Sequence, residues 1–193
     1  MNYLSVYAIF LDEKRYLAEW LEFHRLCGVE HFYLYDNESV DEPLEVLSPW
    51  IECGLVTYRP WPGVKVQTQA YLHCARTYKA DNRWIAFIDI DELLYVADRR
   101  PIPELLGTLE DAPGVGVNWV MFGTSGHETA PDPLVTVAYQ LRGSSGIHFS
   151  EPGLAKPGHT GDKLADYYPL CTHIKSIIDP NRIENVRTPH SFR

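Results

Sequence analysis

The sequence predicts an α/β protein built on a largely parallel sheet with helices on its faces. Two observations lead to this expectation. Across residues 1–90, short apolar runs typical of strands alternate with longer segments of helical periodicity. The apolar run 84–88 then breaks off into Asp89, Asp91 and Glu92, as a buried strand does on leaving the core. A β-α-β-α-β order connects strands by crossovers, and such crossovers produce a parallel sheet.

Local signals give each element in order. The first helix has an apolar stripe that includes Tyr16, Trp20 and His24, which we interpret as packing residues, and Gly28 is placed to end it. Asp41 and Pro43 open the second helix, and a glycine at position 54 stops it. We expect strands at 7–10, 31–35, 55–58, 84–88, 115–122 and 172–178, helices at 13–27, 44–53, 68–79 and 102–109, and a long loop at 143–166.

The bulk composition limits the class of protein. A length of 193 residues suits one domain over residues 1–193, and we expect it to be truncated at its C-terminus because no closing helix follows. The net charge of −9 argues against a nucleic-acid surface. No transmembrane segment or secretory signal is expected, and the four scattered cysteines favour reduced thiols, so we predict a cytoplasmic protein.

The acids after the run 84–88 are the first candidate site. In open α/β sheets, ligands bind outside the carboxyl ends of the strands. Asp89 and Asp91 would supply hard oxygen ligands there, which suit Mg²⁺ or Mn²⁺ carrying a phosphate. The alternative is a solvated strand end without a ligand.

Five blocks of sequence together resemble the glycosyltransferase family 2-like group allied to glycosyltransferase family 92, whose enzymes have the GT-A fold. The blocks are residues 13–24, 29–39, 84–94, 118–127, and 175–180 with 190–192. The resemblance implies the Rossmann-like GT-A fold, a mixed and mostly parallel central sheet flanked by helices. It implies an inverting, metal-dependent transfer of a sugar from a nucleotide-sugar, with a UDP-sugar expected, to an acceptor hydroxyl.

The resemblance also implies partners and a location. The acceptor would be the hydroxyl of a glycan, a glycolipid or another molecule, in a pathway such as cell-surface glycan synthesis. The cofactor would be Mn²⁺ or Mg²⁺, and the enzyme would act in the cytoplasm or peripherally at the inner face of the membrane.

Within this framework the phosphate end of the donor has four candidate residues. Asp91 would coordinate the metal directly, while Asp89 would join it or hold the ribose and a metal-bound water. His190 would be a third metal ligand by resemblance, although a lone histidine near a terminus is more often simply exposed. Lys175 would neutralise the phosphates, and its alternative is a solvated strand lysine.

Other residues are candidates for the nucleoside and for catalysis. Asp36 would accept hydrogen bonds from uracil or ribose, or form an ordinary turn. Glu13 would contact the nucleotide, or simply favour a helix N-terminus, and Gln69 is a weaker candidate of the same kind. Glu128 is our choice of general base, with Asp132 after it. His127 is expected in a loop or acceptor contact, and two tryptophans, at 61 and 119, either stack on a sugar or belong to the core.

Two other functions compete with this interpretation. A phosphatase of the haloacid dehalogenase type also places Asp-x-Asp after an apolar strand, but usually the first strand, with Thr or Val where this chain has Leu93. A non-catalytic nucleotide- or carbohydrate-binding module of the same fold is the second competitor, because fold alone does not guarantee activity.

Overall fold

The strands of the predicted β-α-β pattern pair into one sheet. β1 (Asn2–Phe10), β2 (His31–Asp36), β3 (Val56–Pro60) and β4 (Asn82–Phe87) run parallel to one another. The computed structural model describes residues 1–141, 174–188 and 191–192. In this part of the chain the strand order is β3-β2-β1-β4-β6-β5, where β5 is Gly114–Asn118 and β6 is Ile174–Ile178. β6 pairs antiparallel with β4, so the predicted mixed and mostly parallel sheet is confirmed.

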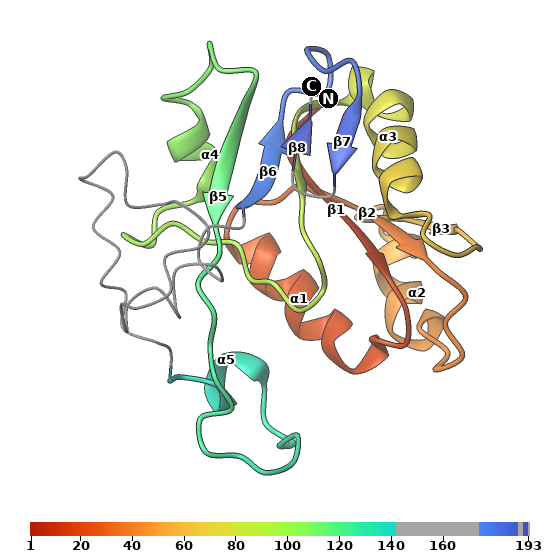
Figure 1. The fold of residues 1–193 in the computed structure, drawn as a ribbon, viewed down its shortest axis with the longest axis vertical. Helices are drawn as coiled ribbons and strands as arrows, with labels where there is room; N and C mark the ends of the chain where they lie inside the picture. The colour runs from red at the N-terminus through yellow and green to blue at the C-terminus, as the bar shows by residue number, and fades with distance from the viewer. Residues whose placement is uncertain (142–173, 189–190, 193) are drawn as a thin grey trace, which may run out of the picture. The chain divides into compact units, whose positions relative to one another are not determined.

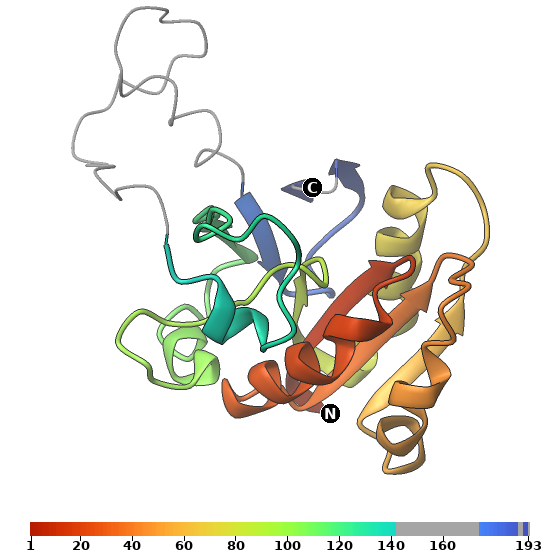
Figure 2. The same cartoon turned by 90° about the horizontal axis from the view of Figure 1, so that it is seen from below.

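Three helices cover the two faces of the parallel strands. α1 (Lys14–Leu26) and α2 (Leu44–Glu52) lie on one face, and α3 (Gln67–Thr77) lies on the other (Figures 1 and 2). Because side chains alternate along a strand, β2 sends Phe32 to the α1 face, where its ring lies 5.7 Å from that of Trp20. Gly28 follows α1 with a φ of +97°, a backbone conformation that few other residues adopt.

The strand order gives the sheet a topological switch point between β1 and β4. β1 pairs with β2 on one side and with β4 on the other, and the connections to these neighbours pass over opposite faces. β1 and β4, the neighbouring parallel strands at which the order reverses, end side by side at one edge of the sheet. Such a switch point is where open α/β sheets bind their ligands.

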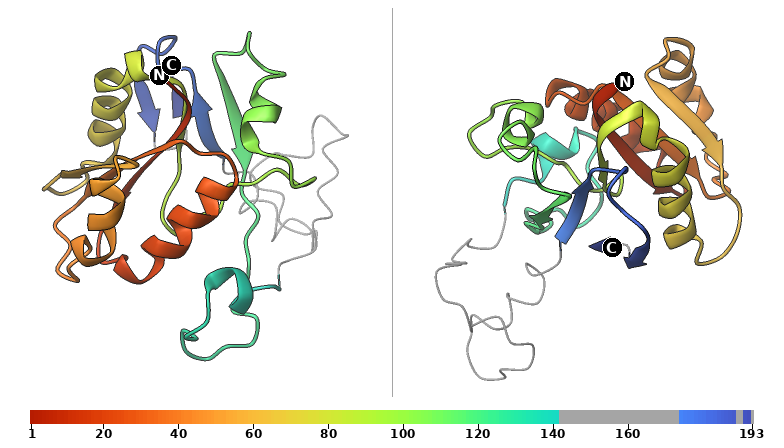
Figure 3. Two further views of the ribbon diagram at one scale, coloured as in Figure 1. Left: turned by 180° about the vertical axis from the view of Figure 1, so that it is seen from behind. Right: turned by 90° about the horizontal axis from the view of Figure 1, so that it is seen from above.

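The later elements differ more from prediction. α4 covers only Ile102–Leu106, and β5 ends at Asn118 rather than 122. A short 3₁₀ helix (Lys79–Asp81) and the strands β7 (Val186–Thr188) and β8 (Ser191–Phe192) were not expected. β7 lies beside α3 (Figure 3), and the Phe192 ring packs 4.7 Å from that of Phe87. The loop expected at 143–166 lies outside the described residues.

The contacts divide the chain into two compact units. The first holds residues 1–116 and 175–193, and the second holds residues 117–174. The described part of the second unit contains α5 (Val135–Ala138), and the Ser125 hydroxyl accepts hydrogen bonds from the amides of Gln140 and Leu141 at 3.0 Å each. Among the described residues, no helix has the length and apolar character needed to span a membrane.

Candidate active site

A pocket of about 400 Å³ opens at the carboxyl edge of the parallel strands, in the first unit. Its wall comes from the loops that follow three of these strands and from the segment that leads into α3. The lining residues are Ile9, Phe10, Leu11, Glu13, Asn37, Lys65, Val66, Gln67, Asp89 and Asp91. The predicted binding edge of the sheet is therefore the edge at which this pocket forms.

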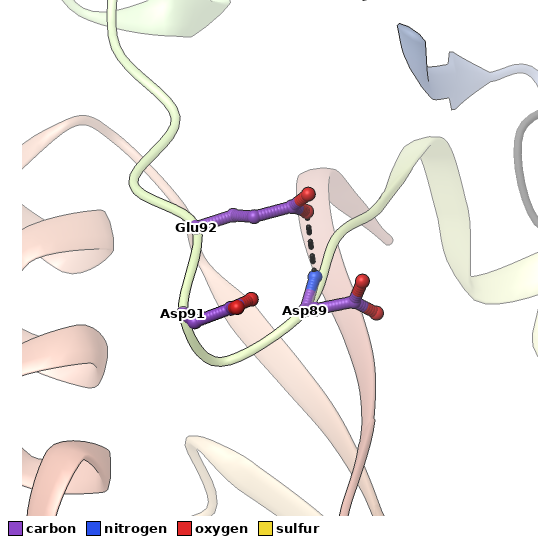
Figure 4. Close-up of side chains that lie close together, drawn as sticks. All are labelled: Asp89, Asp91 and Glu92. Atoms are coloured by element: carbon purple, nitrogen blue, oxygen red, sulfur yellow. Dashed lines mark hydrogen bonds between the residues drawn. The ribbon is translucent and has the colours of Figure 1, made fainter. Parts of the chain in front are cut away.

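Three carboxylates gather on the turn that follows β4. The strand ends at Phe87, and the Glu92 amide donates to the Asp89 carbonyl at 3.2 Å, which closes the turn. The Glu92 carboxylate folds back and accepts a hydrogen bond from the Asp89 amide at 2.8 Å (Figure 4). One oxygen from each of Asp89, Asp91 and Glu92 lies within 4.8 Å of the other two. One small cation could contact all three.

A lysine from β6 compensates part of this charge. Lys175 is only 4% exposed, and its ammonium group forms ion pairs with Asp89 and, at 3.3 Å, with Glu92. Lys175 was predicted as a phosphate contact, and in the structure it contacts the acids that would hold the cation. Its position depends on β6 pairing with β4.

The pocket nevertheless keeps an excess of negative charge. Burial, with the charges of Asp91 and Asp89 adding to it, raises the pKa of Glu13 to about 7. Burial also raises the pKa of Glu92 to about 7, although Lys175 opposes that rise. A bound cation stabilises the ionised form most strongly for carboxylates whose ionisation is suppressed in this way.

The donor atoms fit a hard divalent cation. All are carboxylate oxygens, the ligands that Mg²⁺ and Mn²⁺ prefer, and the pocket leaves space for phosphate oxygens beside them. Asp89 and Asp91 are brought together as predicted, and Glu92 joins them. His190 lies outside the described residues, so its predicted role as a ligand stays a prediction.

Asp36 has structural partners on both of its carboxylate oxygens. One oxygen accepts from the Ser39 amide at 2.8 Å and the other from the Tyr58 hydroxyl at 2.6 Å. The next residue, Asn37, lines the pocket and donates through Nδ2 to the carbonyl groups of Trp61 and Gly63. These contacts match the turn alternative for Asp36, and they hold the loop before α3 against the pocket.

The glutamine beside the acids is Gln67, not the predicted Gln69. Gln67 Nε2 donates to Asp89 Oδ1 at 3.4 Å and to the Tyr71 hydroxyl at 3.3 Å. Gln69 is exposed and does not line the pocket. Because Gln67 lies four residues before the buried Tyr71, helical periodicity could have placed it on the inner face.

The remaining predicted residues lie elsewhere. Glu128 belongs to the second unit, where its side chain is exposed, and its role as base stays a prediction. His127 contacts the Ala138 carbonyl at 3.1 Å in a loop. Trp61 packs on Tyr35 and is half-buried, which favours the core alternative. Trp119 is also half-buried, in the second unit.

Comparison with known proteins decides the family. The sequence model of glycosyltransferase family 92 matches residues 4–192, nearly the whole chain. The chain belongs to glycosyltransferase family 92. A family 92 protein of Oryza sativa subsp. japonica is 32% identical over 143 residues, covering 72% of this chain and 24% of that protein. The resemblance inferred from the five sequence blocks is thus confirmed.

Relatives with more specific names are also similar to this chain. A galactan beta-1,4-galactosyltransferase of Arabidopsis thaliana is 32% identical over 108 residues, 49% of this chain and 20% of the relative. The lipopolysaccharide core biosynthesis glycosyltransferase LpsC of Rhizobium meliloti is 30% identical over 114 residues, 58% of this chain and 40% of the relative. This family 92 chain spans about a quarter of the length of the plant family 92 proteins it matches.

Among solved structures, residues 1–349 of TarS from S. aureus align with 67% of this chain and 38% of that chain. The TM-score is 0.49 and the sequence identity is 13%. A likeness this distant assigns no ligand to the family 92 chain.

Proposed function

We propose that this chain carries the catalytic site of a metal-dependent glycosyltransferase that uses a nucleotide-sugar donor. The observation that carries the proposal is the meeting of Asp89, Asp91 and Glu92 on one turn, where Asp89 and Asp91 line a pocket at the switch point of the sheet. Membership of glycosyltransferase family 92 supplies the reaction class. A divalent cation held by these oxygens would neutralise the charge that develops on the departing diphosphate.

The chain's own residues would orient the donor around this turn. Gln67 fixes one oxygen of Asp89, which leaves the carboxylate in a defined orientation toward the pocket. Lys65, which lines the pocket on the opposite loop, adds a positive charge within reach of a phosphate. Lys175 holds Asp89 and Glu92 together on the buried side of the turn.

The chemical step would be a single displacement with inversion. The acceptor oxygen forms a bond to the anomeric carbon as the bond from that carbon to the diphosphate oxygen breaks. The proton of the acceptor hydroxyl passes to a general base, for which Glu128 is our candidate. We propose a UDP-sugar as donor, as the family resemblance implies. We propose a hydroxyl of a glycan or glycolipid as acceptor, and the names of the galactan and lipopolysaccharide relatives support this class of acceptor.

The test is release of nucleoside diphosphate from a panel of UDP-sugars, with Mn²⁺ and with a chelator. We expect Mn²⁺-dependent release of UDP by the wild-type chain and a large loss in Asp91→Asn, which should fold because the Asp91 side chain is exposed. Binding of UDP-sugars without release, even when acceptor glycans are added, would favour the non-catalytic module instead. Formation of a phosphoaspartate at Asp89 would favour the phosphatase.

A further inference from the structure

Trp20 of α1 holds both ends of the acidic turn, although it does not line the pocket. Its side chain is 1% exposed, and its indole Nε1 donates to the Asp89 carbonyl at 3.1 Å and to the Glu92 carbonyl at 2.9 Å. One N–H shared between the first and last residues of a turn fixes the distance between them. The same two residues carry two of the three carboxylates of the candidate cation site.

His24, one helical turn further along α1, holds the chain just after the turn. Its Nδ1 lies 2.8 Å from the Trp20 carbonyl, and because a carbonyl can only accept, Nδ1 carries the proton. Nε2 of the neutral ring is then an acceptor, and it receives the Leu94 amide at 3.0 Å. The two aromatic side chains therefore form one chain of hydrogen bonds from α1 to residues 89–94.

The carboxylates of the turn need such support. Three acids within 4.8 Å repel one another when ionised, and Lys175 compensates only part of that charge, so contacts that hold the backbone of the turn help to keep its ligand atoms together. Both side chains of the support are themselves held by close packing: the Trp20 and His24 rings lie 4.5 Å apart, and both are buried. Ligands of a metal are oriented by such outer contacts, and removing one costs about 10–100-fold in affinity.

We propose that Trp20 and His24 are positioning residues for the cation site, acting on the backbone of residues 89–94 through the indole N–H and the imidazole Nε2. This inference rests on the proposed function, because it assumes that Asp89, Asp91 and Glu92 bind a cation. It assigns to α1 a role beyond the packing predicted for its stripe. The competing explanation is that the indole N–H and the imidazole Nε2 only provide hydrogen-bond partners for buried backbone groups.

The first test compares Trp20→Phe with Trp84→Phe in the full chain. Trp84 is also fully buried, but it lies in the first half of β4, before the strand reaches the turn, so its replacement removes the same atoms without touching the turn. Binding of Mn²⁺ alone is measured by electron paramagnetic resonance. We expect Trp20→Phe to weaken Mn²⁺ binding by about tenfold or more. Trp84→Phe should bind Mn²⁺ as the wild type does, although both variants unfold at lower temperature.

Two variants of His24 test the inference independently, in case Trp20→Phe does not fold. His24→Leu removes the acceptor for the Leu94 amide, whereas His24→Gln can present an amide oxygen near the position of Nε2. We expect weaker Mn²⁺ binding in the leucine variant and recovery in the glutamine variant. Amide hydrogen exchange at Leu94 in the metal-free protein should follow the same order, faster with leucine than with glutamine.

The outcomes separate the two proposals. If the wild type binds Mn²⁺ and Trp20→Phe binds it as tightly as Trp84→Phe, the positioning role is wrong and the cation site stands. Equal Mn²⁺ affinity and equal Leu94 exchange in the two His24 variants would overturn the positioning role in the same way. If the wild type binds no Mn²⁺, the proposed cation site fails, and the positioning role fails with it.

Discussion

His24 should make the folded chain sensitive to acid in a window that can be calculated. Burial lowers the pKa of its imidazole from 6.5 to about 4, so the folded state resists protonation that the unfolded state accepts. The free energy of unfolding therefore falls as pH drops from 6.5 toward 4. At about 1.4 kcal/mol per unit of pKa, the full loss is about 3 kcal/mol, of which about 2 kcal/mol has occurred at pH 5.

Two carboxylates of the candidate site change the free energy of unfolding with pH in the opposite direction, so a reference variant is needed. Glu13 and Glu92 have pKa values raised to about 7, and their contribution to stability falls as pH rises from 4.5 to 7. We therefore compare the urea unfolding of the wild type and of His24→Gln at pH 7.5 and pH 5, followed by circular dichroism. The difference between the two proteins cancels the contribution of the glutamates, because both proteins carry them. We expect the advantage of the wild type over His24→Gln to shrink by about 2 kcal/mol at pH 5. An equal loss of unfolding free energy in both proteins would refute the claim that His24 is buried in its neutral form.

Three further predictions follow from the site. Because Glu13 and Glu92 are partly protonated near neutrality, Mn²⁺ affinity should rise from pH 6 to pH 8, and Mn²⁺ binding should release protons. Calorimetry in two buffers measures the protons released, and binding without proton release would contradict the raised pKa values. Lys175→Met should lower the free energy of unfolding by about 1–3 kcal/mol. The loss should be smaller than for a fully buried ion pair because Asp89 and Glu92 keep some exposure, and an unchanged midpoint of urea unfolding would contradict this prediction. Gln67→Ala should weaken binding of UDP with Mn²⁺ while Gln69→Ala leaves it unchanged, and equal affinities in calorimetry would remove Gln67 from the site.

The first half of the fold was predictable because its signals are local. Gly28 ends α1, and short continuous apolar runs mark β2 and β4 without reference to the rest of the chain. The place of Asp89 and Asp91 followed from one further rule, that parallel strands end at the same edge of the sheet. Family resemblance then gave the reaction class, which composition could not.

The contacts that organise the site were not predictable, because they join residues far apart in the sequence. Lys175 meets Asp89 only because β6 runs antiparallel beside β4, and no local pattern gives a strand its direction. The apolar stripe of α1 correctly predicted that Trp20 is buried, but periodicity cannot say where an indole N–H points. Gln67 was missed because the expected helix began one residue too late.

Binding of Mn²⁺ to the wild type and to Asp91→Asn, with and without UDP, tests the account most directly. Asp91 is exposed, so its replacement should leave the folded structure intact and isolate its role as a ligand. We expect the wild type to bind Mn²⁺ more tightly when UDP is present, and Asp91→Asn to lose at least about tenfold in affinity. Equal Mn²⁺ affinity in the two proteins would contradict a cation site on this turn.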